Sequence, residues 1–478
     1  MMAQIAAGVN SNRQEVKMKA TILDGSQTND MTGERVRTAL IAQLEVSGWE
    51  VKHVIIRDQK ISNCAGDFFC WVRSPGLCNI NDDNRRIAEA MIASELMVYL
   101  TPVTFGGYSS ILKRMVDHQI KNISPFFAKV NGETHHQKRY DKYPDFLVVG
   151  WMEEPDAQAE AIFRHLARRN CINFYTEKAA CGIVLASQSD DDISASVENW
   201  LNDIHSGQML QTVALPESDN THCSASRIRR ALLLVGSPKT HKSTSNSLGG
   251  YLTEQLDAQS IQTQTVYLHT IVHSPEKMKA LLETVDTADL ITLAFPLYVD
   301  SLPAPVIDVL EHIAMHRQSR EHTHRPLFTA ISNCGFPETQ HNATALAICE
   351  AFAKQAQFEW AGSLALGGGG MIDGTPLVEM GGRTIRIRKS LELAAAALAK
   401  GQAIPKAAQD LMSKPVIPAW AYRLLGDLHW KKAAKSYGVG KSLKRQPFLA
   451  LRSSTNGVEV SVDRPLWHRL QTKPRLKL

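Results

Sequence analysis

The sequence predicts an α/β protein built from two tandem, doubly wound sheets, each with five parallel strands. Ala93–Leu100 is an apolar stretch of strand length that leads through Thr-Pro and Gly-Gly into an amphipathic helix beginning near Ser109. Ala288–Ile313 repeats this arrangement with an apolar strand, a proline, an aromatic residue and a helix. Such a repeat, within an alternation of strands and helices, indicates two copies of one βαβ-based domain.

The first copy contains five predicted strands. The third ends at Leu100, and a polar excursion at Asn131–Tyr143 precedes the fourth. Lys113, Arg114 and His118, on the helix after Leu100, are expected on a solvated face. The other strands are predicted at Lys19–Leu23, Trp49–Ile56, Asp145–Gly150 and Ala179–Ala186, and further helices at Gly33–Val46, Ala157–Arg169 and Ile193–His205.

The second copy follows a polar linker and begins with the apolar run Arg229–Val235. Its later strands are predicted at Ile261–Tyr267, Leu290–Ala294, Pro326–Ser332 and Phe358–Leu366, and its closing helix at Ile385–Lys400. The expected division is a disordered lead-in (1–18), a first domain (19–206), a linker (207–227), a second domain (228–402) and a basic C-terminal extension (403–478).

Composition predicts a cytoplasmic protein with no membrane span. The 478 residues are 44% hydrophobic and 21% charged, which is typical of globular domains. The first twenty residues lack an apolar core of signal-peptide length, and no stretch approaches the length of a membrane span. Eight cysteines without a regular framework fit a reducing compartment.

Positive charge is concentrated at the C-terminal end. From Ala419 onward the chain has 13 Lys+Arg against 3 Asp+Glu, a net charge of +10, so the remaining residues carry −5. Such a tail could contact nucleic acid, an anionic membrane or an acidic partner. No nucleic-acid recognition motif accompanies it, so we expect no nucleic-acid partner and a solvated, partly ordered extension.

A polar loop after the first strand predicts a phosphate site. It runs from Asp24 to the start of a helix at Gly33, where free backbone N–H groups and the positive helix end favour an anion. The hydroxyls of Ser26, Thr28 and Thr32 could add donors. The alternative is a capped helix start without a ligand. Neither a GxGxxG motif nor a Walker lysine is present, so a dinucleotide-binding fold or an ATPase is not indicated.

The loop after Leu100 has the properties of a binding loop for a flat ligand. Ligands of open α/β sheets bind at the carboxyl ends of the strands. Pro102 removes a backbone donor there, while Gly106 and Gly107 allow close backbone approach. Phe105 and Tyr108 add aromatic surface. The alternative is an ordinary loop that uses glycine and proline only to turn.

Both strand-end loops resemble the flavin-contacting loop of flavodoxin-like, NAD(P)H-dependent FMN reductases. The resemblance implies the strand order 2-1-3-4-5, FMN as cofactor and a C-terminal extension, including Met412–Lys432, that packs over the second domain. The second copy matches the family's phosphate loop through Gly-Ser-Pro and a Ser/Thr/Asn cluster, with Lys239 or Lys242 nearby. The implied flavin contacts are Pro102, Val103, Thr104, Phe105, Gly106, Gly107, Tyr108, Gly150, Trp151, Pro296, Leu297, Tyr298, Asn333 and Gly335, and the implied phosphate donors are Ser237, Ser243, Thr244, Ser245 and Asn246.

The implied activity is an oxidoreductase that takes hydride from NADH or NADPH and passes electrons to a small acceptor such as a quinone. The flavin carries this chemistry, so no single residue is assigned as catalytic. The sequence leaves open which copy binds FMN, and whether the flavin site forms in a homodimer or between the two copies of one chain. An alternative is a non-catalytic binding module in which neither sheet holds flavin.

Asn63–Asp83 resembles a cysteine-rich insert of this family, which iron–sulfur flavoproteins use to hold a cubane cluster. Cys64, Cys70 and Cys78 match that pattern, but Asp67 stands where a further cysteine would be. A cubane cluster is normally held by four thiolates, so we expect a structural insert and no bound metal. The alternatives are an iron–sulfur electron carrier, with a cluster at these cysteines, and a redox disulfide between Cys70 and Cys78.

Overall fold

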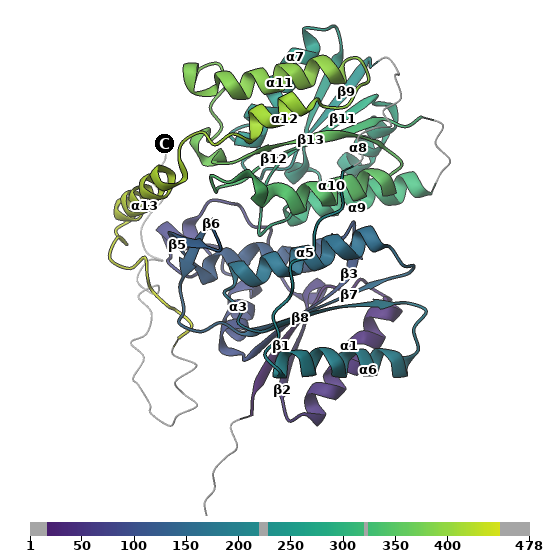
Figure 1. Cartoon of the computed structure of the whole chain (residues 1–478), viewed down its shortest axis with the longest axis vertical. Helices are drawn as coiled ribbons and strands as arrows, with labels where there is room; N and C mark the ends of the chain where they lie inside the picture. Colours follow the sequence, from purple (N-terminus) through teal and green to yellow (C-terminus); the bar gives the residue numbers. More distant parts are fainter. Residues whose placement is uncertain (1–16, 219–227, 320–323, 450–478) are drawn as a thin grey trace, which may run out of the picture.

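The chain folds into two α/β domains stacked one above the other (Figure 1). The computed structural model describes residues 17–218, 228–319 and 324–449. Most of the predicted lead-in, part of the linker and the end of the basic extension therefore lie outside the described residues. None of the helices in these ranges is long and apolar enough to cross a membrane.

Domain 1 has the predicted order of five parallel strands, β2-β1-β3-β7-β8. Helices α1 and α6 cover its outer face, and α3, α4 and α5 lie on the other face (Figure 1). Its strands are β1 (Lys19–Asp24), β2 (Glu50–Ile55), β3 (Leu96–Thr104), β7 (Asp145–Met152) and β8 (Ala179–Leu185), and its main helices are α1 (Met31–Val46), α3 (Asp83–Ala93), α4 (Ser110–Val116), α5 (Ala157–Asn173) and α6 (Asp190–His205).

Domain 2 repeats the topology in the order β10-β9-β11-β12-β13, again fully parallel. Helices α7 and α11 cover its outer face (Figure 1). Its strands are β9 (Arg230–Val235), β10 (Gln262–Tyr267), β11 (Leu290–Pro296), β12 (Leu327–Asn333) and β13 (Glu359–Leu366), and its main helices are α7 (Thr244–Asp257), α8 (Pro275–Thr287), α9 (Ala304–Gln318), α10 (Ala343–Gln355) and α11 (Ile385–Leu398).

The central strand of domain 1 shows why continuous apolar runs predict such a sheet. Side chains alternate between the two faces of a strand, and in β3 both faces are covered by helices. Val98 and Leu100 pack with α1 and α6, whereas Met97 and Tyr99 contribute to the core on the opposite face. All four side chains are buried.

The two domains share one hydrophobic core. Helices α4 and α5 of domain 1 pack against α9 and α10 of domain 2, between the two sheets (Figure 1). The rings of Phe105 and Phe352 meet edge to face across this interface, with centroids 5.2 Å apart. The Ser110 hydroxyl also donates to Glu311 at 2.6 Å. The two copies therefore pair within a single chain.

Two segments of domain 1 are more regular than the sequence predicts. Strand β3 continues past Leu100 to Thr104 and pairs back with β4 (Gly107–Tyr108). The turn between them has positive φ values of 52° at Phe105 and 78° at Gly106, so the predicted loop after Leu100 forms a tight hairpin. The polar excursion forms another hairpin, β5 (Ile123–Val130) with β6 (Glu133–Lys138), outside the main sheet.

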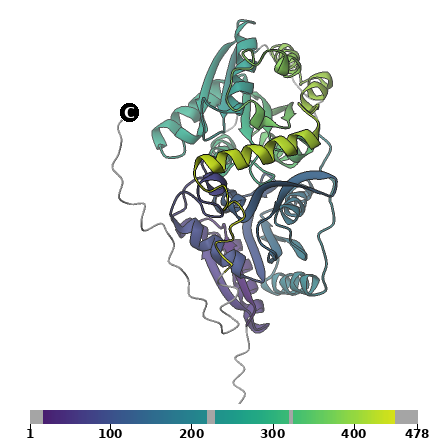
Figure 2. The same cartoon turned by 90° about the vertical axis from the view of Figure 1, so that its left-hand side faces the viewer.

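The C-terminal extension packs on both domains rather than on domain 2 alone. Helix α12 (Lys406–Ser413) lies against α11 and β13, as expected. Helix α13 (Ala419–Ser436) instead contacts β5 and the short helix α2 (Phe69–Val72) of domain 1. Figure 2 shows α13 running across the boundary between the two domains.

Candidate functional site

The loop between β9 and α7 presents free backbone donors at a helix start. Ser243 caps α7, because its Oγ accepts a hydrogen bond from the backbone N–H of Asn246 at 3.1 Å. The N–H groups of Thr244 and Ser245, the first two helical residues, have no acceptor within the helix, whose hydrogen bonds run four residues back. These donors and the helix dipole favour an anion such as a phosphate monoester. The exposed Lys239 and Lys242 lie on the same loop.

The next strand-end loop of domain 2 is rigid. Two backbone hydrogen bonds between Tyr298 and Ser301, of 2.9 and 3.1 Å, close a tight turn at the end of β11. Val299 and Asp300 inside this turn have positive φ values of 47° and 57°. The turn directs the Tyr298 ring toward domain 1, where a Cβ on Gly66 would collide with its Oη. Tyr298 therefore joins the domain 2 loop to the cysteine-containing segment of domain 1.

Asn333 connects the strand ends of domain 2. Its Nδ2 donates to Ser245 Oγ and to the backbone oxygen of Phe295, both at 2.9 Å, so one amide links α7, β11 and β12. A Cβ on Gly335 would meet open space. The neighbouring Cys334 is buried, which raises its thiol pKa to about 12 and leaves it a poor nucleophile.

In the equivalent loop of domain 1, the protein's own carboxylates accept hydrogen bonds from the backbone N–H groups. Asp30 caps α1 by accepting from the N–H of Gly33 at 2.9 Å. Asp24 lies 1% exposed at the end of β1 and accepts from the N–H of Ser26 at 2.9 Å. Burial opposes the ionisation of Asp24, but hydrogen bonds from His53 and Ser26 outweigh it and hold the pKa below its ordinary value. An ionised carboxylate thus occupies a position where a phosphate would accept the same type of bond.

The other predicted contacts in domain 1 are largely buried. The indole of Trp151 lies over Gly33, and its Nε1 donates to Asp30 at 3.1 Å. Phe105 is in the interdomain core, and the Tyr108 hydroxyl donates to Asn170 at 3.1 Å inside domain 1. A Cβ on Gly150 would collide with Phe163 and Val103. Of the predicted hydroxyl donors, Thr28 is exposed, whereas Ser26 and Thr32 are buried.

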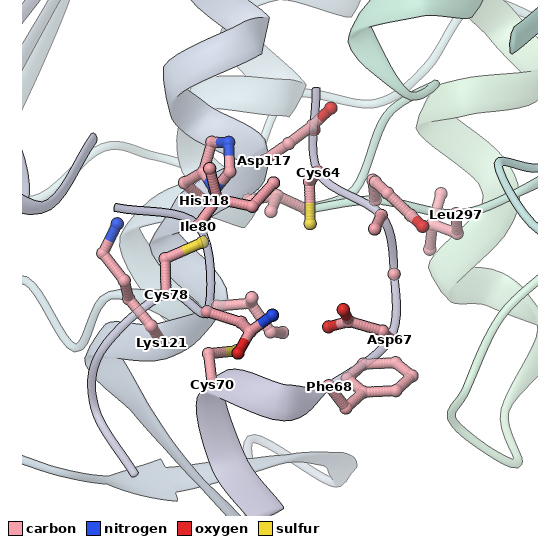
Figure 3. A pocket seen from close by; sticks show the side chains of 16 residues that line it. Cys64, Asp67, Phe68, Cys70, Cys78, Ile80, Asp117, His118, Lys121 and Leu297 are labelled. Atoms are coloured by element: carbon pink, nitrogen blue, oxygen red, sulfur yellow. Dashed lines mark hydrogen bonds between the residues drawn. The ribbon is translucent and has the colours of Figure 1, made fainter. Parts of the chain in front are cut away.

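The cysteine-containing segment of domain 1 forms a cavity at the domain interface (Figure 3). Cys64, Cys70 and Cys78 line this cavity of about 100 Å³, and the carboxylate of Asp67 points into it beside them. The domain 2 residues Leu297, Tyr298 and Val299 complete the lining. A segment of domain 1 and a predicted flavin loop of domain 2 therefore make a single site.

One prediction about the helical segment behind this cavity is wrong. Lys113 and His118 do not lie on a solvated face. The Lys113 side chain is 0% exposed because α4 packs against α9, and the His118 side chain, two residues beyond α4, is 2% exposed. Nε2 of His118 is 2.7 Å from the Ser62 carbonyl, and Nδ1 faces the Cys78 sulfur at 3.7 Å. Lys121 also lines the cavity. Lys113 and Asp117 are four residues apart and pair with each other, but this spacing is equally common on solvated helix faces, so the sequence did not indicate their burial.

The electrostatics of the cavity keep the thiols of Cys64 and Cys70 protonated. Burial, together with the charge of Asp117, raises the pKa of Cys64 to about 12. Burial and the neighbouring cysteines also raise the pKa of Cys70. Burial lowers the pKa of His118 to about 4, so its ring is neutral at pH 7. Such thiols are poor nucleophiles, but a bound metal would reverse this balance by deprotonating its ligands.

A second group of ligand-type side chains lies across the domain interface. Within the described ranges, Glu133, His135 and His341 bring three ligand atoms within 4.8 Å of one another. Arg169 already donates to Glu133 at 2.6 Å, and its other terminal nitrogen is 2.7 Å from Nδ1 of His341. The guanidinium therefore occupies the space that a cation would need.

Comparison with known proteins identifies the family. The sequence profile of NADPH-dependent FMN reductases matches residues 18–133 and again 229–356, about half of the chain and part of each domain. The chain belongs to this family. Both matches begin at or just before the first strand of a domain and include its first loop, so the repeat predicted from the strand-end loops is a duplication of the reductase domain.

Individual relatives match over shorter lengths. An iron–sulfur flavoprotein of Methanosarcina thermophila is 28% identical over 103 residues, which are 22% of this chain and 53% of that protein. The chain thus matches about half the length of this curated relative. An FMN-dependent NADH-azoreductase of Bacillus anthracis, solved with FMN, aligns along all of its own chain with 36% of this chain. The identity is 16% and the TM-score is 0.28. An NAD(P)H:quinone oxidoreductase of Methanothermobacter marburgensis covers 37% of this chain with 96% of its own, at 14% identity and a TM-score of 0.28.

Proposed function

We propose that the protein is an FMN-dependent NAD(P)H oxidoreductase that binds its flavin in domain 2 and passes electrons to a small acceptor such as a quinone. The observation that supports domain 2 is the contrast between the two phosphate loops. Ser243 caps α7 with a neutral hydroxyl and leaves the amides of Thr244 and Ser245 to an anion, whereas the carboxylates of Asp24 and Asp30 lie at the domain 1 loop and would repel a phosphate.

The types of residue at the strand ends of domain 2 suit the binding of FMN. The start of α7 supplies backbone donors for the phosphate, and Lys239 and Lys242 add positive charge. Asn333 holds the phosphate loop to the strand ends, and the rigid turn at Tyr298 limits one side of the site. When bound, FMN supplies the ring that accepts hydride and returns electrons, and the protein positions that ring.

A second candidate function is electron transfer through an iron–sulfur cluster in the same protein. The observation that favours it is the convergence of Cys64, Cys70, Cys78 and Asp67 on one cavity. Thiolates are the usual ligands of iron–sulfur clusters, and three cysteines line this cavity together with one carboxylate. If filled, the site would lie directly beside the Leu297–Val299 loop.

The test is to purify the full chain anaerobically, release its flavin with acid and quantify both flavin and iron against protein. The proposal expects about one FMN per chain and bleaching of the flavin bands by NADH or NADPH. Two FMN per chain would contradict the assignment to domain 2 alone. A protein that takes up no FMN would reject the oxidoreductase and leave a binding module, while iron at several atoms per chain would support the second candidate.

A further inference from the structure

Helix α13 carries an exposed row of large apolar side chains. Trp420, Leu424 and Leu428 are four residues apart and therefore lie on one side of the helix. They are 67%, 57% and 53% exposed, and Leu425 beside them is 57% exposed. An apolar row along one helix is more than the scattered hydrophobic residues that are normal on a protein surface.

The opposite side of α13 is fixed to the body of the protein. The hydroxyl of Tyr422 donates to the backbone oxygen of Gly335 at 2.6 Å, and a Cβ on Gly426 would collide with Phe127. Trp430 packs in a small cluster with Trp71 and Phe68. These contacts fix the rotation of the helix about its axis, so the apolar row faces outward with each side chain more than half exposed.

Positive charge continues the apolar row toward the end of the helix. Lys431, Lys432 and Lys435 are exposed on the same side, one to two turns after Leu428. The sole acidic residue of α13, Asp427, faces inward, where its carboxylate accepts from the N–H of Phe127 at 3.0 Å. The chain beyond Leu449 adds six Lys or Arg residues against two acidic ones. Within α13 itself, the outward face combines apolar and cationic groups without an acid.

We propose that this face of α13 docks on the surface of an anionic phospholipid membrane, with the helix lying in the plane of the interface. An apolar row with a tryptophan at its end fits the acyl boundary, and adjoining lysines fit the phosphate groups above it. A second copy of the chain would present an equally basic face, and like charges would oppose that pairing. The lipid surface supplies both the apolar and the negatively charged environment.

Docking would bring the strand-end loop of domain 2 close to the membrane. Tyr422 lies on the inner side of the same helix and holds Gly335, which is one of the predicted flavin contacts. A lipid-dissolved acceptor could then reach this edge of the sheet. That consequence rests on the proposed function, whereas the docking itself depends only on α13.

The test is co-sedimentation of the full chain with vesicles of phosphatidylcholine alone and of phosphatidylcholine mixed with phosphatidylglycerol. Binding is expected with the anionic vesicles and is expected to weaken as salt is added. The variant K431Q/K432Q/K435Q should reduce the partition coefficient roughly 100-fold, because each basic residue near an anionic surface contributes about fivefold. The variant L424S/L428S should reduce it at least tenfold. The control K277Q/K279Q, which changes two exposed lysines of α8, should bind like the original chain.

Three results would overturn the proposal: no binding to anionic vesicles at low salt, equal binding to neutral and anionic vesicles, and binding that neither α13 variant reduces. Sedimentation velocity on the same samples gives an independent check. A dimer that L424S/L428S dissociates would show that a second copy covers the row. Flavin content and NAD(P)H turnover without vesicles are measured in parallel, so a failure of the proposed function is seen separately from a failure of docking.

Discussion

The ammonium group of Lys113 in domain 1 donates a hydrogen bond to the backbone carbonyl of Tyr298 in domain 2, at 2.8 Å. Lys113 also pairs with Asp117, whose second carboxylate oxygen accepts from the N–H of Ala304 at 2.8 Å. Burial lowers the pKa of Lys113 and raises that of Asp117. A buried ion pair of domain 1 thus holds both the turn at Tyr298 and the start of α9.

Replacing Lys113 by methionine is expected to destabilise the protein by about 3–5 kcal/mol, because it leaves the Asp117 carboxylate buried without its partner. The double variant K113M/D117N contains no buried charge, and its amide oxygen can still accept from Ala304. We expect it to recover most of the loss. Urea unfolding measures both values, with the half-buried neighbour R114M as a control. A double variant as unstable as K113M would show that the lost bond to Tyr298, rather than the unpaired charge, causes the effect.

The assignment of FMN to domain 2 can be tested at a single backbone N–H. Thr244 is the first residue of α7, where proline is tolerated, and the extended backbone of Ser243 suits a following proline. T244P should therefore keep the helix but remove one donor to the phosphate, weakening FMN binding by about tenfold or more. T244V loses the hydroxyl bond to Gly369 but keeps the N–H, so it should bind more tightly than T244P.

The matched control in domain 1 is M31P, because Met31 is the first residue of α1 and is 77% exposed. Its FMN affinity should equal that of the original chain, measured by fluorescence titration of the apoprotein. A loss of flavin in M31P and none in T244P would show that the flavin binds in domain 1 instead.

The cysteine cavity gives a prediction about iron. Asp67 points into the cavity beside three cysteines, so D67C would supply the fourth thiolate that a cubane cluster normally has. After anaerobic reconstitution, D67C should hold iron more tightly and show a stronger visible thiolate-to-iron absorption than the original chain. The control D67N removes the carboxylate and should hold less iron than either. Equal iron content in all three proteins would exclude position 67 as a ligand.

Sequence predicted the sheets well, since apolar runs such as Met97–Leu100 and the loops between them depend on local patterns. The order of the strands followed from the family resemblance. Whether an individual polar residue is buried or exposed depends on residues far away in the sequence, so it could not be predicted. Lys113 is buried only because α9 of the other domain covers α4. In the phosphate loop of domain 1, Asp30 accepts a hydrogen bond from the indole of Trp151, which lies on a strand 121 residues later. Neither contact leaves a periodic signal.

Two histidines that the fold keeps neutral predict a loss of stability in acid. Burial, with a smaller effect of His135, lowers the pKa of His136 to about 3. In the unfolded chain this pKa is about 6.5, so between these values the unfolded state binds more protons. The stabilising contribution of neutral His136 is complete above about pH 6.5 and falls by about 1.4 kcal/mol for each pH unit below it. His118, whose pKa burial lowers to about 4, acts in the same direction.

H136Q should make the free energy of unfolding less dependent on pH between 6.5 and 4.5, by about 1.4 kcal/mol per unit. The glutamine amide can donate to the carbonyl of Pro125, which lies 3.2 Å from Nδ1 of His136. Urea unfolding at several pH values gives the slope for each protein, and comparison with the original chain cancels the contribution of the carboxylates. H429Q, at an exposed histidine of α13, should leave the slope unchanged. If H136Q and the original chain lose stability at the same rate, His136 takes up its proton in the folded state as readily as in the unfolded one.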